Sequence, residues 1–156
     1  MRGFPIWLPL ATLGFIGAPA FANAQGECHV GHVARHDEIL GLFEQWNARL
    51  QSGDPGQVAA LYMDGALLLP TLSASPRLTR QAHMNYFRGF LADRPVGTLD
   101  ETHVFAGCGE ATLAGLYTFR FASTGKAVPA RFTFNYRRID GEWLITHHHS
   151  SVLPTQ

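Results

Sequence analysis

The stretch DGEWLITHHHSSVLP, residues 140–154, places three consecutive histidines near the end of an expected strand. Because side chains alternate along a strand, His147 and His149 share one face and His148 takes the other. A His-x-His pair on a strand can bind zinc if a neighbouring element supplies a third ligand. The candidates for that ligand are His83, Glu142 and Glu110. The alternatives are that His147 and His149 line a pocket, or that one histidine bonds a carbonyl or carboxylate while another lies at a subunit interface. We expect no metal site, and we assign His147 and His149 to the rim of a pocket.

An expected strand at Ala127–Ile139 carries the strongest candidate for an anion anchor, Arg131. Polar and aromatic residues alternate along it, with Arg131, Thr133, Asn135 and Arg137 on one face and Phe132, Phe134 and Tyr136 on the other. An arginine that faces inward from a central strand must be paired or bind an anionic ligand. We expect Arg131 to face a pocket roofed by helices, with a partner subunit covering the aromatic face. The reverse arrangement packs the aromatic residues against the helices and leaves the arginines in water.

Other side chains could complete such a pocket. Arg77 could reach the pocket mouth and pair with an anion, or it could form a surface ion pair. Tyr62, Tyr86 and Tyr117 are either core aromatics or sources of a hydroxyl within the pocket. His83 can serve as a general base at neutral pH. The acidic residues near the pocket, Asp64, Asp100, Glu101 and Glu110, lie near the ends of expected elements rather than at inward positions.

Residues 1–24 have the pattern of a secretory signal peptide. A short basic start at Met1-Arg2 precedes an apolar run, Phe4–Gly17, and Ala22 and Ala24 occupy the small positions of a cleavage site. The apolar run is about 14 residues long, whereas a membrane helix needs ~20. We therefore expect a periplasmic or secreted protein with no membrane attachment after cleavage. Residues 25–156 then form a single domain with a real hydrophobic core.

The charge balance of residues 25–156 excludes some classes of partner. Without Arg2, eleven basic residues face twelve acidic ones, so the net charge is about −1. No basic face is indicated, and we expect no nucleic-acid partner. The sequence contains no dinucleotide fingerprint or flavin motif, and we expect no cofactor.

The two cysteines, Cys28 and Cys108, are predicted to form one disulfide. Export would place them in an oxidising compartment, where a distant pair is usually bonded. The bond would join the start of the mature chain to the turn at Ala106–Gly109. The alternative is a redox or metal-binding pair, but neither cysteine belongs to a Cys-x-x-Cys motif.

The pattern of elements predicts helices first and strands later. Apolar periodicity and capping residues predict helices at Asp37–Leu50 and Arg80–Leu91, with a short helix after Asp54 and an edge strand at Ala66–Leu72 between them. Four strands then follow at Leu99–Ala106, Ala111–Ala122, Ala127–Ile139 and Glu142–Val152, with Asp140-Gly141 as the strongest hairpin signal. This order indicates an α+β domain in which one antiparallel sheet is covered by helices on one face.

Three stretches resemble the nuclear transport factor 2-like superfamily, which has a cystatin-like fold. They are HMNYFRGFL (83–91), ARFTFNYRRIDGEW (130–143) and LITHHHSSVLP (144–154). The details are most similar to the calcium/calmodulin-dependent kinase II association domain, within the wider SnoaL-like set of secreted bacterial proteins. The resemblance runs from about Asp37 to Pro154.

The resemblance implies a cone-shaped sheet wrapped over a long first helix, a dimer formed through the sheet, and a pocket at the open end of the cone. In the kinase association domain that pocket accepts small carboxylates through a helix histidine and strand arginines. His83 matches the histidine, Arg131 matches one arginine, and Tyr117 matches a tyrosine beside the other. The position of that second arginine is Phe119 here.

We therefore expect an exported homodimer that binds a small organic molecule, with an anionic ligand as one possibility. Arg131 would anchor the charge, His83, Tyr86 and Tyr117 would supply hydrogen bonds, and Arg77, His147 and His149 would form the rim. One alternative is a cofactor-independent isomerase, cyclase or hydrolase with His83 as its base. The other is an oligomerisation module without a ligand.

Overall fold

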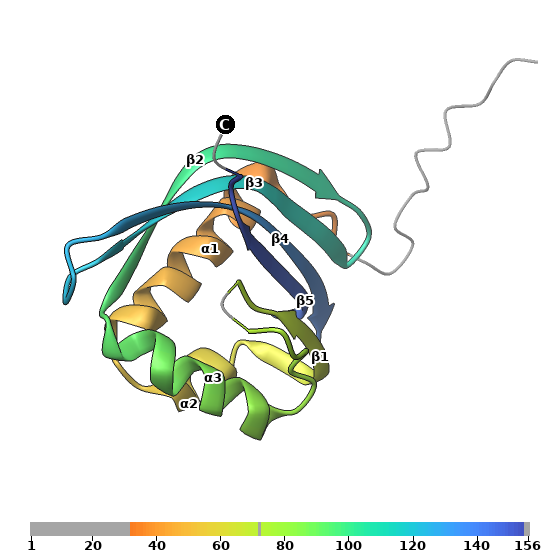
Figure 1. Cartoon of the computed structure of the whole chain (residues 1–156). Coiled ribbons are helices and arrows are strands. Elements are labelled where there is room, and N and C mark those ends of the chain that lie inside the picture. The colour runs from red at the N-terminus through yellow and green to blue at the C-terminus, as the bar shows by residue number, and fades with distance from the viewer. Residues whose placement is uncertain (1–31, 72, 155–156) are drawn as a thin grey trace, which may run out of the picture.

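The computed structural model describes residues 32–71 and 73–154, so the signal-peptide pattern and Cys28 lie outside the described residues. Within them, the elements follow in the order α1 (His36–Gln51), α2 (Pro55–Ala59), β1 (Tyr62–Leu69), α3 (Arg80–Ala92), β2 (Pro95–Ala106), β3 (Glu110–Phe121), β4 (Ala127–Ile139) and β5 (Glu142–Val152). A curved sheet arches over the helices, which lie on its concave side (Figure 1). The predicted α+β architecture is confirmed. No helix in this part of the chain is long and apolar enough to cross a membrane.

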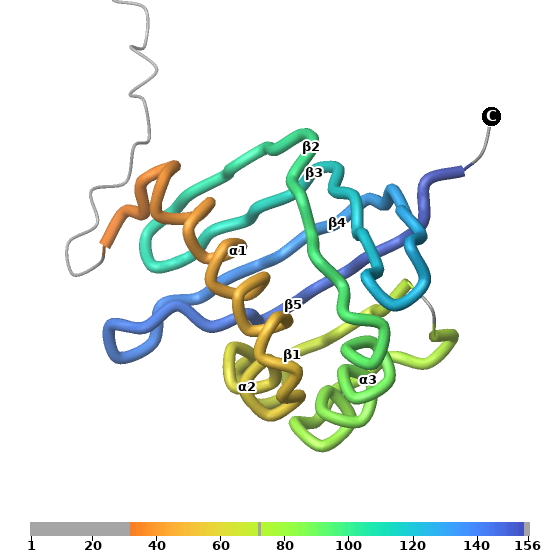
Figure 2. Tube along the Cα trace, turned by 90° about the vertical axis from the view of Figure 1, so that its left-hand side faces the viewer, coloured from red at the N-terminus to blue at the C-terminus, as the bar shows by residue number. Residues whose placement is uncertain are grey.

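Helix α1 supplies the floor of the core. Its apolar residues recur every three or four positions and give it one buried face. Ile39, Phe43, Trp46 and Leu50 are each at most 2% exposed. Figure 2 shows α1 running beneath the strands, with α2 and α3 gathered at one end of the molecule.

The two shorter helices begin where side chains cap them. Asp54 accepts a hydrogen bond from the backbone N–H of Gly56 at 2.8 Å, and Pro55 occupies the first helical position of α2. Thr79 accepts one from the backbone N–H of Ala82 at 3.2 Å and so starts α3. The Thr79 cap fixes where α3 begins. The position of that start decides which face of α3 points inward, and this face carries the buried ring of Phe87.

The sheet has the strand order β1-β5-β4-β3-β2. Strands β2 to β5 form the predicted antiparallel meander, and the Asp140-Gly141 turn between β4 and β5 has positive φ at both residues. The prediction of a wholly antiparallel sheet is wrong at one edge, because β1 pairs with β5 in parallel. Strand β1 also starts at Tyr62, four residues earlier than expected, while Pro70 follows its end as an edge position allows.

The orientation of β4 reverses the expected one. Phe132, Phe134 and Tyr136 are at most 4% exposed and pack on the concave side, whereas Arg131 and Arg137 are exposed on the convex side. The rings of Phe132 and Phe134 lie 6.2 and 6.3 Å from that of Phe43 on α1. Burying aromatic rings against a helix is more favourable than burying guanidinium groups, because a buried charge needs a partner. The helices, not a second subunit, cover the aromatic face.

Candidate functional site

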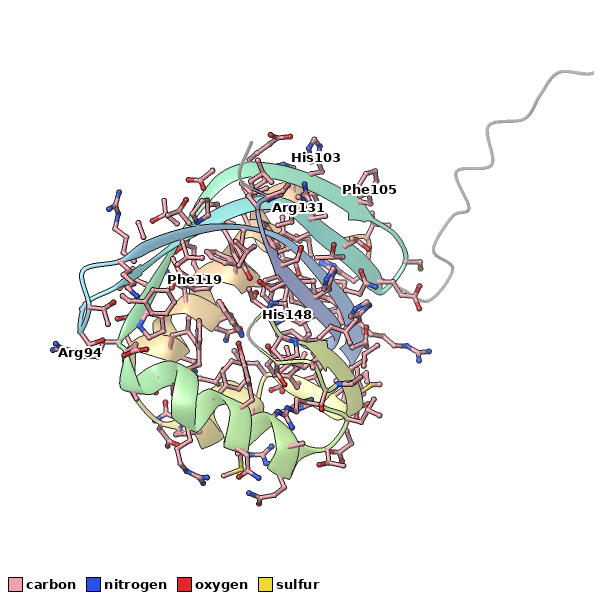
Figure 3. The ribbon with its side chains drawn as sticks, viewed as in Figure 1. Arg94, His103, Phe105, Phe119, Arg131 and His148 are labelled. Carbon is pink, nitrogen blue, oxygen red and sulfur yellow. The ribbon has the colours of Figure 1, made fainter. Side chains whose placement is uncertain are left out.

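The space between the concave face of the sheet and the helices, which we call the cone, contains a cavity of about 60 Å³. Its walls are mostly apolar: Trp46, Leu68, Phe87, Phe90, Phe119 and Phe121 all line it. Figure 3 shows Phe119 and His148 beneath the arch of the sheet, on the side of the helices. One water needs about 10–15 Å³ of such volume, so the cavity can hold a molecule larger than water, and it is smaller than the roughly 150 Å³ of an engineered cavity that binds benzene. It is therefore of a size for a short-chain organic molecule.

Three hydroxyl groups form a chain on one wall of the cavity. The hydroxyl of Tyr117 donates to Ser150 Oγ at 2.6 Å, and Ser150 is hydrogen-bonded in turn to the hydroxyl of Thr71. All three residues line the cavity, and Tyr117 is 1% exposed. Burial raises the pKa of Tyr117, so its hydroxyl stays protonated and acts as a donor. The chain thus joins β3, β5 and the loop after β1.

A second polar chain crosses the core and ends at His148. The indole N–H of Trp46 donates to the hydroxyl oxygen of Tyr62 at 3.1 Å, and that hydroxyl lies 2.8 Å from Nδ1 of His148. The imidazole ring stacks on Phe134 with 4.0 Å between ring centroids and meets Trp46 edge-on at 5.4 Å. Helix α1 and strands β1, β4 and β5 therefore fix the orientation of His148 together.

His148 is an uncharged, buried imidazole with one unused nitrogen. Burial, with smaller contributions from His147, His149 and His83, lowers its pKa to about 3. The side chain is 4% exposed, and its Nε2 atom has no hydrogen-bond partner within residues 32–71 and 73–154. His148 lines the cavity, and Nε2 is the ring nitrogen that no described residue already occupies.

Two of the predicted pocket residues lie where expected. Tyr117 forms part of the hydroxyl chain, and Tyr86 lines the cavity from α3 with its ring stacked on Phe90 at 5.9 Å. Burial raises the pKa of Tyr86 to about 12, against a smaller opposing effect of Arg77. Tyr86 and Tyr117 therefore both line the cavity.

His83 and Arg77 lie beside the cone but do not line the cavity. Nε2 of His83 donates to the carbonyl oxygens of Ala66 and Arg77, at 3.0 and 3.1 Å. This geometry ties α3 to β1 and makes Nε2 a donor. Because His83 does not line the cavity, the structure does not support it as the base of a reaction there. The guanidinium of Arg77 is half-buried and donates to Ser73 Oγ at 2.9 Å.

Arg131, His147 and His149 lie on the convex face, outside the cone. The prediction that Arg131 faces the pocket is wrong, because the aromatic residues of β4 take the inward positions. Arg131 and His149 instead border an open groove on the outside of the sheet, next to the pair formed by His103 Nε2 and Glu101 Oε1 at 2.8 Å. Figure 3 shows Arg131 and His103 on the opposite side of the sheet from His148. The prediction that His147 and His149 form the rim of the cone is also wrong, because the aromatic residues of β4 take the inward positions.

The arrangement offers binding contacts rather than an acid–base pair. No lining residue of the cavity carries a carboxylate or a permanent positive charge. Among the described residues, no three His, Cys, Asp or Glu side chains are grouped so as to hold a metal ion. His147 and His149 point outward while His83 is buried beneath the sheet, so these three do not converge.

His148 and its partners were not predicted from the sequence, because a bulge in β5 changes the alternation of its side chains. Tyr136 pairs with Ile145 but Asn135 pairs with His147, so Thr146 is an extra residue. Strict alternation from the buried Ile145 would turn His147 and His149 inward. The signal available in the sequence was the aromatic alternation of β4, since His148 pairs with the buried Phe134.

Comparisons with known proteins agree with the fold. Residues 35–154 match the family model of the calcium/calmodulin dependent protein kinase II association domain. A Xanthomonas campestris crystal structure named for the same domain is 41% identical, with a TM-score of 0.76 over 79% of this chain and 91% of that one. Comparison with curated proteins gives no match.

More distant structures share the fold alone. An NTF2-like protein with a cystatin-like fold from Novosphingobium aromaticivorans is 16% identical, with a TM-score of 0.64 over 77% of this chain and 82% of that one. A candidate dehydratase of the NTF2-like family from Streptomyces avermitilis is 12% identical, with a TM-score of 0.65 over 76% of this chain and 96% of that one.

Proposed function

The chain belongs to the calcium/calmodulin dependent protein kinase II association domain family, and from that premise we propose that its cone binds a small organic molecule. The observation that carries the proposal is the cavity itself, with apolar walls and a buried His148 Nε2 that has no partner in the described part of the chain. Small-molecule sites are typically apolar cavities with a few convergent polar groups. Both features are present here.

Binding is a better interpretation than catalysis. A proton-transfer enzyme needs a base within hydrogen-bonding reach of the substrate. The cavity lining contains no carboxylate, and Nδ1 of the imidazole that lines it is already hydrogen-bonded to the hydroxyl of Tyr62. We therefore place binding ahead of the isomerase, cyclase or hydrolase alternative.

We also propose that the protein is exported and acts as a dimer. The signal-peptide pattern of residues 1–24 supports export to the periplasm or beyond. A Cys28–Cys108 disulfide would then join the start of the mature chain to the β2–β3 turn, where Val33 pairs with Cys108 and the backbone N–H of Gly109 donates to the carbonyl oxygen of His32. The convex face, with Phe105 66% exposed, is the surface proposed for the dimer.

Native mass spectrometry of the protein and its Ala130→Leu variant tests the binding function. Ala130 lines the cavity and is 2% exposed, so a larger side chain there fills the space. We expect an organic adduct on the unaltered protein that is lost on denaturation and is absent from the variant. An adduct carried equally by both proteins would place binding outside the cone.

A further inference from the structure

The hydroxyl chain that lines the cavity has one hydrogen that is not used within the chain. The chain of Tyr117, Ser150 and Thr71 contains three hydroxyl hydrogens but only two hydrogen bonds between its members. Tyr117 donates to Ser150, so one hydrogen remains on either Ser150 or Thr71, whichever way their shared bond runs. Because both residues line the cavity, this hydrogen is available to a bound molecule.

The tautomer of His148 follows from its partners. An indole N–H can only donate, so the Tyr62 oxygen accepts from Trp46. The other partner of the Tyr62 hydroxyl among the described residues is Nδ1 of His148, so the Tyr62 hydrogen has an acceptor only when Nδ1 carries no hydrogen. The pKa of His148 is lowered to about 3 by burial, so the ring is uncharged near neutral pH. Its single ring hydrogen is then on Nε2, the atom without a partner among the described residues. A buried N–H without an acceptor is unfavourable, and an acceptor in the cavity removes that cost.

The lining of the cavity offers hydrogen-bond donors but no charged group, and this limits the class of ligand. A carboxylate placed in this cavity would be a buried anion with no cation in the lining, which is strongly unfavourable. A ketone, ester or lactone brings an acceptor oxygen and apolar atoms but no charge and no donor.

We propose that the cone selects uncharged carbonyl compounds, whose oxygen accepts a hydrogen bond from Nε2–H of His148, with the free hydroxyl of Ser150 or Thr71 as a second donor. This proposal rests on the binding function proposed above. His148 is then the residue that determines specificity.

The test compares 2-pentanone with butyrate, which have the same number of non-hydrogen atoms and differ in charge. Dissociation constants are measured by NMR titration at pH 7.5 for the full protein, for His148→Phe, and for His149→Phe as a matched control on the convex face. We expect 2-pentanone to bind at least about tenfold more tightly than butyrate, which corresponds to ~1.4 kcal/mol. His148→Phe should lose at least about tenfold in ketone affinity, and His149→Phe should leave it unchanged. Equal binding of the two probes, or unchanged ketone binding by His148→Phe, would overturn the proposal.

A second measurement on the unaltered protein covers the case in which His148→Phe does not fold. A long-range ¹H–¹⁵N spectrum reports which ring nitrogen of His148 carries the hydrogen. We expect the Nε2–H form, with a signal that shifts on addition of 2-pentanone. An Nδ1–H form, or an Nε2 signal that stays in place while 2-pentanone binds, would contradict the assignment.

The outcomes also separate the two proposals. Binding of both probes without preference, lost in Ala130→Leu, would leave the cone as a binding site and remove only the carbonyl selectivity. If neither probe binds the unaltered protein, the binding function fails and the selectivity fails with it.

Discussion

The hydroxyl of Tyr62 connects helix α1 to His148, which lines the cavity. It accepts from the Trp46 indole and reaches Nδ1 of His148, so it satisfies two buried polar groups at once. Tyr136 is a matched contrast: it is 4% exposed, yet its hydroxyl has no partner in the described part of the chain. The two tyrosines therefore have similar burial but opposite hydrogen-bonding roles.

We expect Tyr62→Phe to lower the free energy of unfolding by roughly 2 kcal/mol or more, because it leaves two buried groups unsatisfied. Tyr136→Phe should change the free energy of unfolding by less than about 0.5 kcal/mol, or raise it, because it removes an unpaired buried hydroxyl. Urea unfolding of the two variants measures both values. Equal losses in the two variants would show that the Trp46–Tyr62–His148 chain contributes no net stability.

The depressed pKa of His148 has a consequence for acid stability. From 6.5 down to about 3 the unfolded chain gains a proton at this residue and the folded chain does not, so stability falls as the pH falls. The groups that affect it are Tyr62 on β1, His83 on α3, and His147 and His149 on its own strand.

We expect His148 to reduce the free energy of unfolding by about 1.4 kcal/mol per pH unit within this range. The carboxyl of Glu38, whose pKa is lowered to about 2 chiefly by its hydrogen bond to His32, adds its own loss below pH 4.5. The measurement is therefore the difference in slope between the protein and His148→Phe from pH 6.5 to 4.5. Parallel slopes would mean that His148 titrates normally in the folded state.

At the scale of elements, the sharp curvature of the sheet depends on a bulge in β2. The register of β2 against β3 shifts between Leu99 and Glu101, next to the pair formed by Thr102 and Gly115. Gly115 has a φ of 155°, and a Cβ placed there would lie 1.9 Å from the carbonyl oxygen of Glu101. Only glycine allows the two strands to approach this closely.

We therefore expect Gly115→Ala to lower the free energy of unfolding by roughly 2 kcal/mol or more, since the backbone must move. Gly41→Ala is the matched control, because Gly41 lies in α1 with open space around its missing Cβ. That variant should be more stable by about 0.5–1 kcal/mol through helix propensity. Thermal unfolding of both variants measures these changes in stability. A Gly115→Ala variant as stable as the unaltered protein would show that the bulge can relax.

The elements were largely predictable from the sequence, whereas the inward face of β4 and β5 was not. Periodicity and capping located α1, α3, β4 and β5 to within two residues, because each signal is local. The start of β1 at Tyr62 was not predicted, because it depends on pairing with Ile145, far along the chain. The bulge at Thr146, which turns His148 inward, depends on the partner strand in the same way.

At the scale of the whole molecule, the convex face is the surface proposed for a dimer. Phe105 is 66% exposed, and Leu116 lies half-buried beside Arg131 in the open groove of this face. The original reason for a dimer, an uncovered aromatic face on β4, does not hold, since those rings pack on α1. Exposed apolar residues on the convex side, such as Phe105, support a dimer formed through this face.

We expect the protein to have the mass of a dimer in light scattering, and Leu116→Asp to give the mass of a monomer. A charge at this half-buried position would be desolvated in the interface without a partner. Glu44→Arg, an exposed change on α1, is the control and should remain dimeric. A monomer before mutation, or a dimer unaffected by Leu116→Asp, would remove the convex face from consideration.

The binding function of the cone is tested most directly by the indole signals of Trp46 and Trp143 in an NMR titration with 2-pentanone. Trp46 lines the cavity, whereas the indole N–H of Trp143 donates to Glu38 at 2.7 Å, away from the cavity lining. We expect the Trp46 signal to shift in a saturable way while the Trp143 signal stays in place. Equal movement of both signals, or movement of Trp143 alone, would contradict binding in the cone.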